Sequence, residues 1–65
     1  MTKEMYILAL QRIAEMYPHA YAEFDSMDAW IEYKINTLEK DGWTSKKAGD
    51  DYAATYRQAY STRPK

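Results

Sequence analysis

The sequence predicts an all-α protein, a small three-helix bundle in which residues 18–24 form either a short extra helical turn or a loop. Three observations lead to this fold class. The chain contains nine alanines, no valine and no Asn-Gly-type hairpin turn, which disfavours a sheet. Apolar side chains recur at helical spacing in three separate segments. Both prolines and Gly42 fall at the ends of these segments.

The length of 65 residues allows a single domain, residues 1–65, and we expect residues 62–65 to form a mobile tail. A domain this small gains little stability from its core and often needs a disulfide, a metal or a partner subunit. With no cysteine and one histidine in the chain, the first two supports are not expected. The stability of the domain is therefore expected to come from self-association or from unusually good helix packing.

The first helix is expected to begin after Thr2, a suitable N-cap, and to end before Pro18. Its apolar arc, which includes Met5 and Met16, covers more than half of the circumference. One neighbouring helix cannot cover so wide an arc. We therefore expect this helix to be central in the bundle or shared with another chain. Leu8 falls outside the arc and is interpreted as an isolated exposed leucine.

Residues 18–24 form either a short helical turn or a loop, since proline is tolerated at the first helical position. Asp25 and Ser26 are adjacent candidate caps for a second helix over residues 27–40. Gly42 suits the left-handed position that follows a helix. The stripe that this helix is expected to bury consists of Met27, Trp30, Ile31, Ile35 and Leu38.

Lys34 falls inside this stripe, and we expect its methylenes to cover apolar surface while its ammonium reaches water. An acidic strip borders the helix and consists of Glu23, Asp25, Asp28, Glu32 and Glu39. One interpretation is a negative surface that docks on a basic protein surface, such as a nucleic-acid-binding groove, and inhibits it. The other is a solvated helix face.

The third helix is expected to start at residues 44–45, with Trp43 packing back on its first turn. A later start near residues 49–51 is the alternative, because Lys46 and Lys47 are unfavourable in a first turn. Its core-facing stripe is predicted to be Ala48, Tyr52, Ala53, Tyr56, Ala59 and Tyr60. Its polar face is predicted to be Asp51, Thr55, Arg57 and Gln58.

The net charge of −1 is unevenly distributed along the chain. Residues 1–42 hold four basic and eight acidic side chains, whereas residues 43–65 hold five basic and two acidic ones. Tyrosine, tryptophan and arginine are enriched at interfaces. The second candidate binding set is Trp43, Lys46, Lys47, Tyr52, Tyr56, Arg57 and Tyr60. These residues suit either a protein partner or nucleic acid. In the second case the basic side chains would contact phosphates and an aromatic ring would stack on the bases. The second and third helices would then form a helix–turn–helix.

Catalysis has little support in this residue inventory. Glu15, His19 and Glu23 have i, i+4, i+8 spacing, but Pro18 interrupts the helix that would align them. No Gly-rich phosphate loop, paired metal-thiolate spacing or nucleophile elbow is present. No enzymatic activity, cofactor or metal is therefore predicted.

The sequence favours a cytoplasmic location, because it contains no cysteine, no signal-peptide pattern and no apolar run approaching the ~18 residues of a membrane span. No membrane partner is expected. The predicted function is a small interaction module, a regulator or inhibitor that binds another protein's surface, of a size typical of microbial and phage accessory proteins. The alternatives are a nucleic-acid-binding domain and a structural homo-oligomer.

Overall fold

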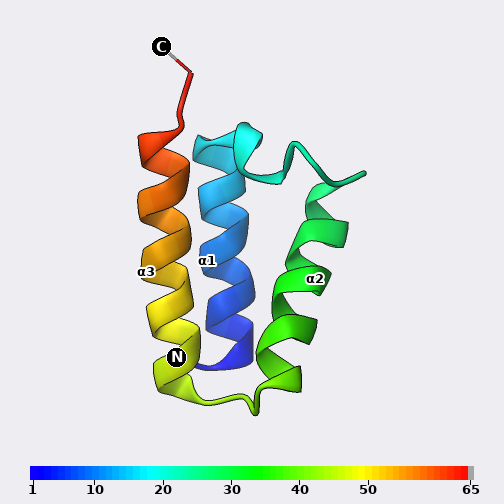
Figure 1. Ribbon diagram of the computed structural model, residues 1–65, viewed down its shortest axis with the longest axis vertical. Helices are drawn as coiled ribbons and strands as arrows, with labels where there is room; N and C mark the ends of the chain where they lie inside the picture. Colours follow the sequence, from blue (N-terminus) through cyan, green and yellow to red (C-terminus); the bar gives the residue numbers. More distant parts are fainter. Residues whose placement is uncertain (65) are drawn as a thin grey trace.

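The computed structural model describes residues 1–64, so Lys65, in the predicted mobile tail, lies outside the described residues. This range is 77% helical without any strand, which confirms the predicted three-helix bundle (Figure 1). The elements in chain order are α1 (Lys3–Met16), the 3-10 helix η1 (Pro18–Tyr21), α2 (Met27–Lys40) and α3 (Ser45–Ser61). Beyond α3, Thr62 Oγ1 still donates to the Gln58 carbonyl at 2.8 Å.

The ends of α1 are determined by the residues that flank it. The Thr2 hydroxyl accepts the N–H of Met5 at 3.1 Å and caps the first turn. The helix stops at Met16 because Pro18 disfavours the helical conformation in Tyr17, whose φ and ψ are −133° and 76°. Both predicted ends are confirmed.

The segment between α1 and α2 forms a helical turn, with Pro18 at its start. Of the two candidate caps for α2, Ser26 is the one used, since its hydroxyl accepts the N–H of Ala29 at 3.1 Å. Gly42, just beyond α2, has a φ of 85°. Glycine adopts this left-handed conformation without steric cost, which confirms its predicted place after the helix.

The earlier of the two predicted starts of α3 is correct. The Thr44 hydroxyl caps the helix by accepting the N–H of Lys47 at 3.0 Å. The lysines of the first turn are balanced by carboxylates, Lys46 by Asp50 at 3.0 Å and Lys47 by Asp41 at 3.6 Å. These pairs offset the unfavourable interaction of the lysines with the helix dipole.

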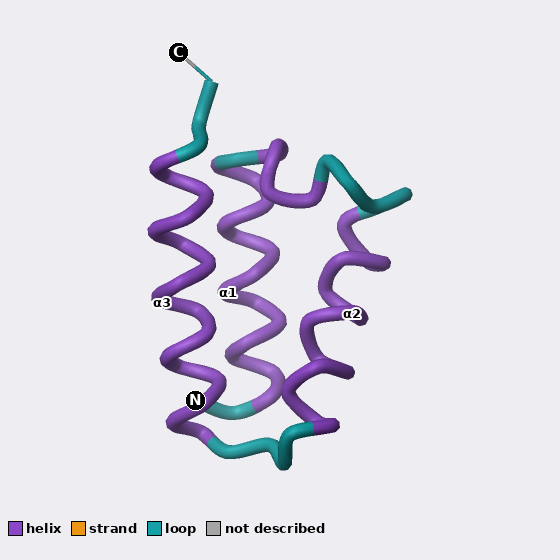
Figure 2. The backbone as a smooth tube through the Cα atoms, in the orientation of Figure 1, coloured by secondary structure: helices purple, strands orange, loops and turns teal. Residues whose placement is uncertain are grey.

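α1 lies between the other two helices, as its wide apolar arc predicts (Figures 1 and 2). The helices run along the longest dimension of a molecule that measures 36 × 22 × 17 Å. α1 contacts α2, α3 and η1, whereas α2 and α3 make few contacts with each other. The buried apolar residues are Tyr6, Leu10, Ile13, Ala14, Trp30, Ile31, Ala48 and Ala59.

The buried face of α3 differs from the predicted one. Thr55, assigned to the polar face, is 7% exposed, whereas Ala53 and Tyr60, assigned to the core, are exposed. The reason is a polar contact inside the bundle. Thr55 Oγ1 accepts a hydrogen bond from Lys34 Nζ of α2 at 2.9 Å, so the threonine can face inward with its hydroxyl satisfied.

Lys34 does not extend its ammonium into water, contrary to the prediction. Its Nζ lies 3.6 Å from the Asp51 carboxylate, and its side chain is only 23% exposed. Asp51 also accepts hydrogen bonds from Thr55 at 3.4 Å and from the Tyr6 hydroxyl. Burial first, and then the Asp51 carboxylate, raise the pKa of Tyr6, so this hydroxyl remains protonated. We call Tyr6, Lys34, Asp51 and Thr55 the polar bridge, because they link all three helices.

Candidate functional site

The outer surface of α1 exposes three large apolar side chains. Leu8 is 61% exposed, Met5 is 55% exposed and Met16 is 53% exposed. Leu8 is exposed as predicted, but it is not isolated, because other apolar side chains adjoin it. Met5 and Met16, which were predicted to belong to the buried arc, are exposed as well. Met5 and Leu8 share a shallow surface depression with other apolar side chains of α1 and α3. We call this set the apolar face and define it as Met1, Met5, Leu8, Ala9 and Tyr52.

Beyond Tyr52 of the apolar face, α3 carries Tyr56 and Tyr60, which lie beside Tyr17 at the end of α1. Tyr17 makes edge contacts with Tyr56 and Tyr60, whose ring centroids lie 6.1 and 6.4 Å from its own. The Arg63 guanidinium lies 3.9 Å from the centroid of Tyr60, in cation–π geometry. Tyr52 and Tyr56 are half-buried, whereas Tyr60 is exposed. The tyrosine stripe therefore belongs partly to the core and partly to the surface.

The structure divides the predicted acidic strip. Asp28, Glu32 and Glu39 lie on one edge of α2. The Glu39 carboxylate forms an ion pair of 2.7 Å with Lys3 of α1. Asp25 is exposed in the turn before α2. Glu23 is separate from this edge and lines a cavity beside α3. Asp28 and Glu32 are thus the part of the strip that remains a common exposed edge.

The remaining aromatic and basic candidates are spread over several surfaces. Trp43 packs edge-on against Tyr6 with ring centroids 5.5 Å apart, which places it beside the core. Lys46 and Lys47 are paired with aspartates, and Arg57 is exposed on α3. A phosphate would have to displace those aspartates. α2 and α3 run in opposite directions on the two sides of α1 (Figure 1), unlike the steep crossing of two contacting helices in a helix–turn–helix.

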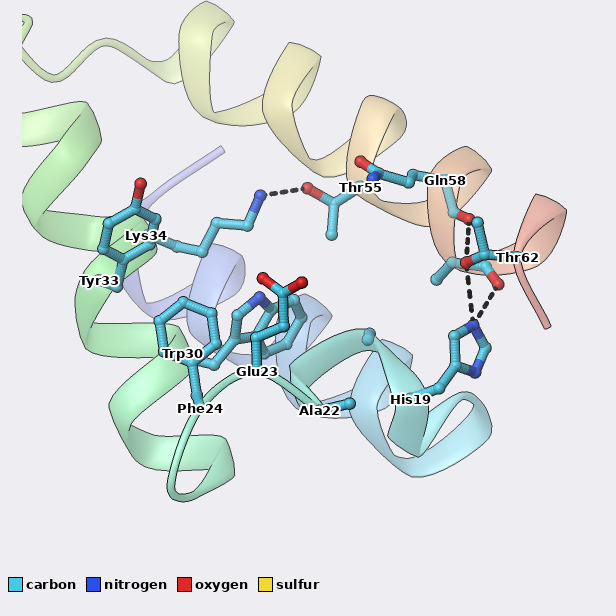
Figure 3. Close-up of a pocket in the computed structure, with 12 residues that line it drawn as sticks. His19, Ala22, Glu23, Phe24, Trp30, Tyr33, Lys34, Thr55, Gln58 and Thr62 are labelled. Carbon is cyan, nitrogen blue, oxygen red and sulfur yellow. Dashed lines mark hydrogen bonds between the residues drawn. The ribbon is translucent and has the colours of Figure 1, made fainter. Parts of the chain in front are cut away.

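A cavity of about 490 Å³, which we call the groove, opens between α2, α3 and η1 (Figure 3). Its aromatic wall consists of Phe24, Trp30 and Tyr33, and the rings of Phe24 and Tyr33 are 5.4 Å apart between centroids. Figure 3 shows the Glu23 carboxylate directed into the groove, between Trp30 and the Lys34 side chain. The groove therefore combines an aromatic wall with charged groups.

Hydrogen bonds hold the two ends of the groove in place. At one end, His19 Nε2 of η1 lies 2.8 Å from the Ala59 carbonyl oxygen and 3.2 Å from the Thr62 hydroxyl. Because a carbonyl oxygen only accepts, the contact with Ala59 requires the proton on Nε2. At the other end, Lys34 reaches across to Thr55. α2, α3 and η1 are thus tied together around the open space.

The spacing of Glu15, His19 and Glu23 does not produce a common site. Pro18 begins a new helix after α1, and His19 is directed at α3. Within residues 1–64, no group of three or more histidine, aspartate and glutamate side chains is arranged to hold a metal ion.

The apolar face and the groove both escaped prediction from sequence. Met1, Met5 and Leu8 have i, i+4, i+7 spacing, which signals a second apolar stripe on α1. That signal was hidden because Met5 also fits the wide arc assigned to the core. The groove offers no comparable signal, since its walls come from three segments that no regular spacing relates.

Comparison of the chain with family models, with curated proteins and with solved structures found no match. Across residues 1–64, no helix has both the length and the apolar character needed to cross a membrane. Function is therefore inferred from the surfaces described above.

Proposed function

We propose that the protein is a cytoplasmic interaction module that regulates or inhibits another protein by covering part of its surface. The observation that supports this function best is the exposure of Met5, Leu8 and Met16, each more than half accessible to solvent on one helix. Met5 and Leu8 also share one surface depression, and exposed apolar side chains that gather in this way mark binding surfaces, where methionine adapts well to varied partners. The absence of cysteine supports the cytoplasmic location.

The shape and charge of the apolar face favour an amphipathic helix as the bound element. Met5 and Leu8 of α1 and Tyr52 of α3 line a shallow depression where two helices lie side by side. A third helix can lay its apolar side along such a surface. Arg12 lines the same depression, and Arg63 follows the end of α3. Acidic residues beside the partner's apolar stripe would complement these cations.

Partner capture from the native host, followed by mass spectrometry, tests this proposal with matched variants. Leu8→Lys places a charge in the apolar face and is expected to abolish capture while the helical circular dichroism spectrum is retained. Ala54→Lys makes the same type of change at an exposed position of α3 outside the face and should leave capture unchanged. Capture that survives Leu8→Lys would contradict the proposal.

The acidic edge is tested in the same experiment by the double charge reversal Asp28→Lys, Glu32→Lys. We expect this variant to retain the partner. Loss of capture here, together with retention by Leu8→Lys, would assign binding to the acidic edge.

The two alternative functions give different results. A solution mass above the 7.7 kDa of one chain that falls to one chain in Leu8→Lys would identify a second copy as the occupant of the apolar face. Nucleic-acid binding would appear as a low-salt gel shift that weakens steeply with salt and is lost on Lys46→Gln, Lys47→Gln. We expect neither result.

A further inference from the structure

We infer that the groove between α2, α3 and η1 binds one arginine side chain of a partner protein, with the guanidinium on the Glu23 carboxylate and against the aromatic wall. This inference rests on the proposed function, because it requires a protein partner. It concerns a different surface from the apolar face, so the two can be tested separately.

Glu23 provides the charge that recognises a cation. Its carboxylate points into the groove in Figure 3 and takes part in none of the four ion pairs found among residues 1–64. A carboxylate with both oxygens available can accept two parallel N–H bonds from one guanidinium. This bidentate geometry favours arginine over lysine, whose ammonium acts as a point charge.

Lys34 also lines the groove, but a neighbouring carboxylate balances its charge. Its Nζ donates to Thr55 at 2.9 Å and lies 3.6 Å from Asp51. Among the other groove residues that carry nitrogen, His19 uses Nε2 on the Ala59 carbonyl, and Gln58 and Trp30 are uncharged. The charge left facing the groove is therefore that of Glu23, which favours a cationic ligand over an anionic one.

The aromatic wall favours the same ligand. A guanidinium is planar, stacks on aromatic rings and is less strongly hydrated than an ammonium, so it loses less on entering a partly closed space. The half-buried Phe24 and the exposed Tyr33 offer ring faces at the groove, and the buried Trp30 also lines it. The cavity of about 490 Å³ is larger than one side chain, which leaves room for the backbone that carries it.

The two tryptophans provide a probe and an internal control. Trp30 lines the groove, whereas Trp43 packs against Tyr6 at the start of α3. In an NMR titration of the whole chain with N-acetyl-arginine amide, we expect the Trp30 indole N–H resonance to move and that of Trp43 to stay fixed. N-acetyl-citrulline amide, which keeps the shape but lacks the charge, should move neither. An unmoved Trp30 resonance at tens of millimolar arginine amide would overturn the inference.

Two variants with the same charge change separate the groove from general electrostatic attraction. Glu23→Gln should weaken binding of the arginine probe by about tenfold, since a charged hydrogen-bond acceptor is lost. Glu32→Gln, on the exposed edge of α2 outside the groove, should bind as the wild type does. Equal weakening in both variants would refute the assigned role of Glu23.

A glycine-rich peptide that carries one central arginine distinguishes an arginine side chain of a protein from free L-arginine as the ligand. Binding at least as tight as that of the blocked amino acid supports a partner side chain. A preference for free L-arginine would assign the groove to a small molecule and overturn the partner assignment. Failure of the Trp30 titration refutes the groove assignment alone, whereas capture that survives Leu8→Lys refutes the proposed function alone.

Discussion

The contacts of α1 with its neighbours and the contact between α2 and α3 are built from different interactions. The three largest fully buried side chains, Tyr6, Leu10 and Ile13, all belong to α1. α2 and α3 instead meet through Lys34 and Thr55, and the groove lies open beside this contact. In a chain this short only one helix is enclosed, and the two outer helices keep surface for recognition.

The two kinds of contact differ because apolar packing and hydrogen bonds stabilise the fold in different ways. Apolar contacts contribute in proportion to the area that they remove from water, so α1 must be enclosed on several sides. A hydrogen bond to a charged group acts between a few atoms and does not require the surrounding space to be filled. The polar bridge can therefore hold α2 near α3 while the groove remains open.

The largest expected change in the free energy of unfolding comes from removing an apolar side chain that α1 buries. Leu10 is fully buried, so Leu10→Ala should lower the free energy of unfolding by about 3 kcal/mol. Ile35 of α2 is only partly buried, and Ile35→Ala should cost about 1 kcal/mol. Urea unfolding followed by circular dichroism measures both values. Equal losses would contradict the unequal distribution of the core.

The polar bridge is expected to contribute less. Lys34→Met and Thr55→Val should each lower the free energy of unfolding by about 1–2 kcal/mol, because each removes one partner of a hydrogen bond to a charged group. The double variant should lose less than the sum of the two single losses, since the two side chains interact directly. Strict additivity in this double-mutant cycle would show that the Lys34–Thr55 contact contributes nothing.

Alkaline pH should weaken the link between Tyr6 and Asp51. Burial and the Asp51 carboxylate raise the pKa of Tyr6 above its ordinary value of 10.0, so the folded chain keeps a proton that the unfolded chain releases. The resulting stability is present below that value and is lost as the pH rises above it. The stability advantage of the wild type over Tyr6→Phe should therefore shrink by about 1 kcal/mol between about pH 8 and about pH 10.5.

Urea unfolding of both proteins at the two pH values checks this expectation. The other tyrosines and the lysines titrate in both proteins and cancel in the difference. An advantage that does not change with pH would rule out the contribution of the Tyr6 hydroxyl.

The smallest expected effect is that of charge on the apolar face. Leu8→Lys should change the free energy of unfolding by less than about 0.5 kcal/mol, because the leucine is 61% exposed and lysine is a good helix former. Thermal or urea unfolding measures it directly. A loss comparable to that of Leu10→Ala would show that the face belongs to the core and is not free for a partner.

The helix boundaries were predictable from sequence because neighbouring residues determine them. Thr2, Ser26 and Thr44 cap the helices that follow them, Pro18 ends α1 and Gly42 follows α2. These signals act over a few residues and need no knowledge of the tertiary structure.

The orientation of α3 was not predictable in the same way. It depends on Lys34, which is 21 residues before Thr55 in the chain and is a residue type expected at the surface. Glu23 was selected from sequence, but as part of an acidic strip. Its true neighbours, the aromatic wall of the groove, are brought to it by the turn at η1 and by the packing of α2.

Methionine oxidation with and without the partner reports whether the apolar face is covered when the complex forms. The protein is treated with limiting hydrogen peroxide, alone and with its captured partner, and sulfoxide formation at each methionine is measured by mass spectrometry. In the free protein, Met5 and Met16 should oxidise faster than the partly buried Met27. The partner should protect Met5, which belongs to the apolar face, and leave Met27 unchanged. Protection of Met27 at the start of α2, with no protection of Met5, would show that the partner binds elsewhere than the apolar face.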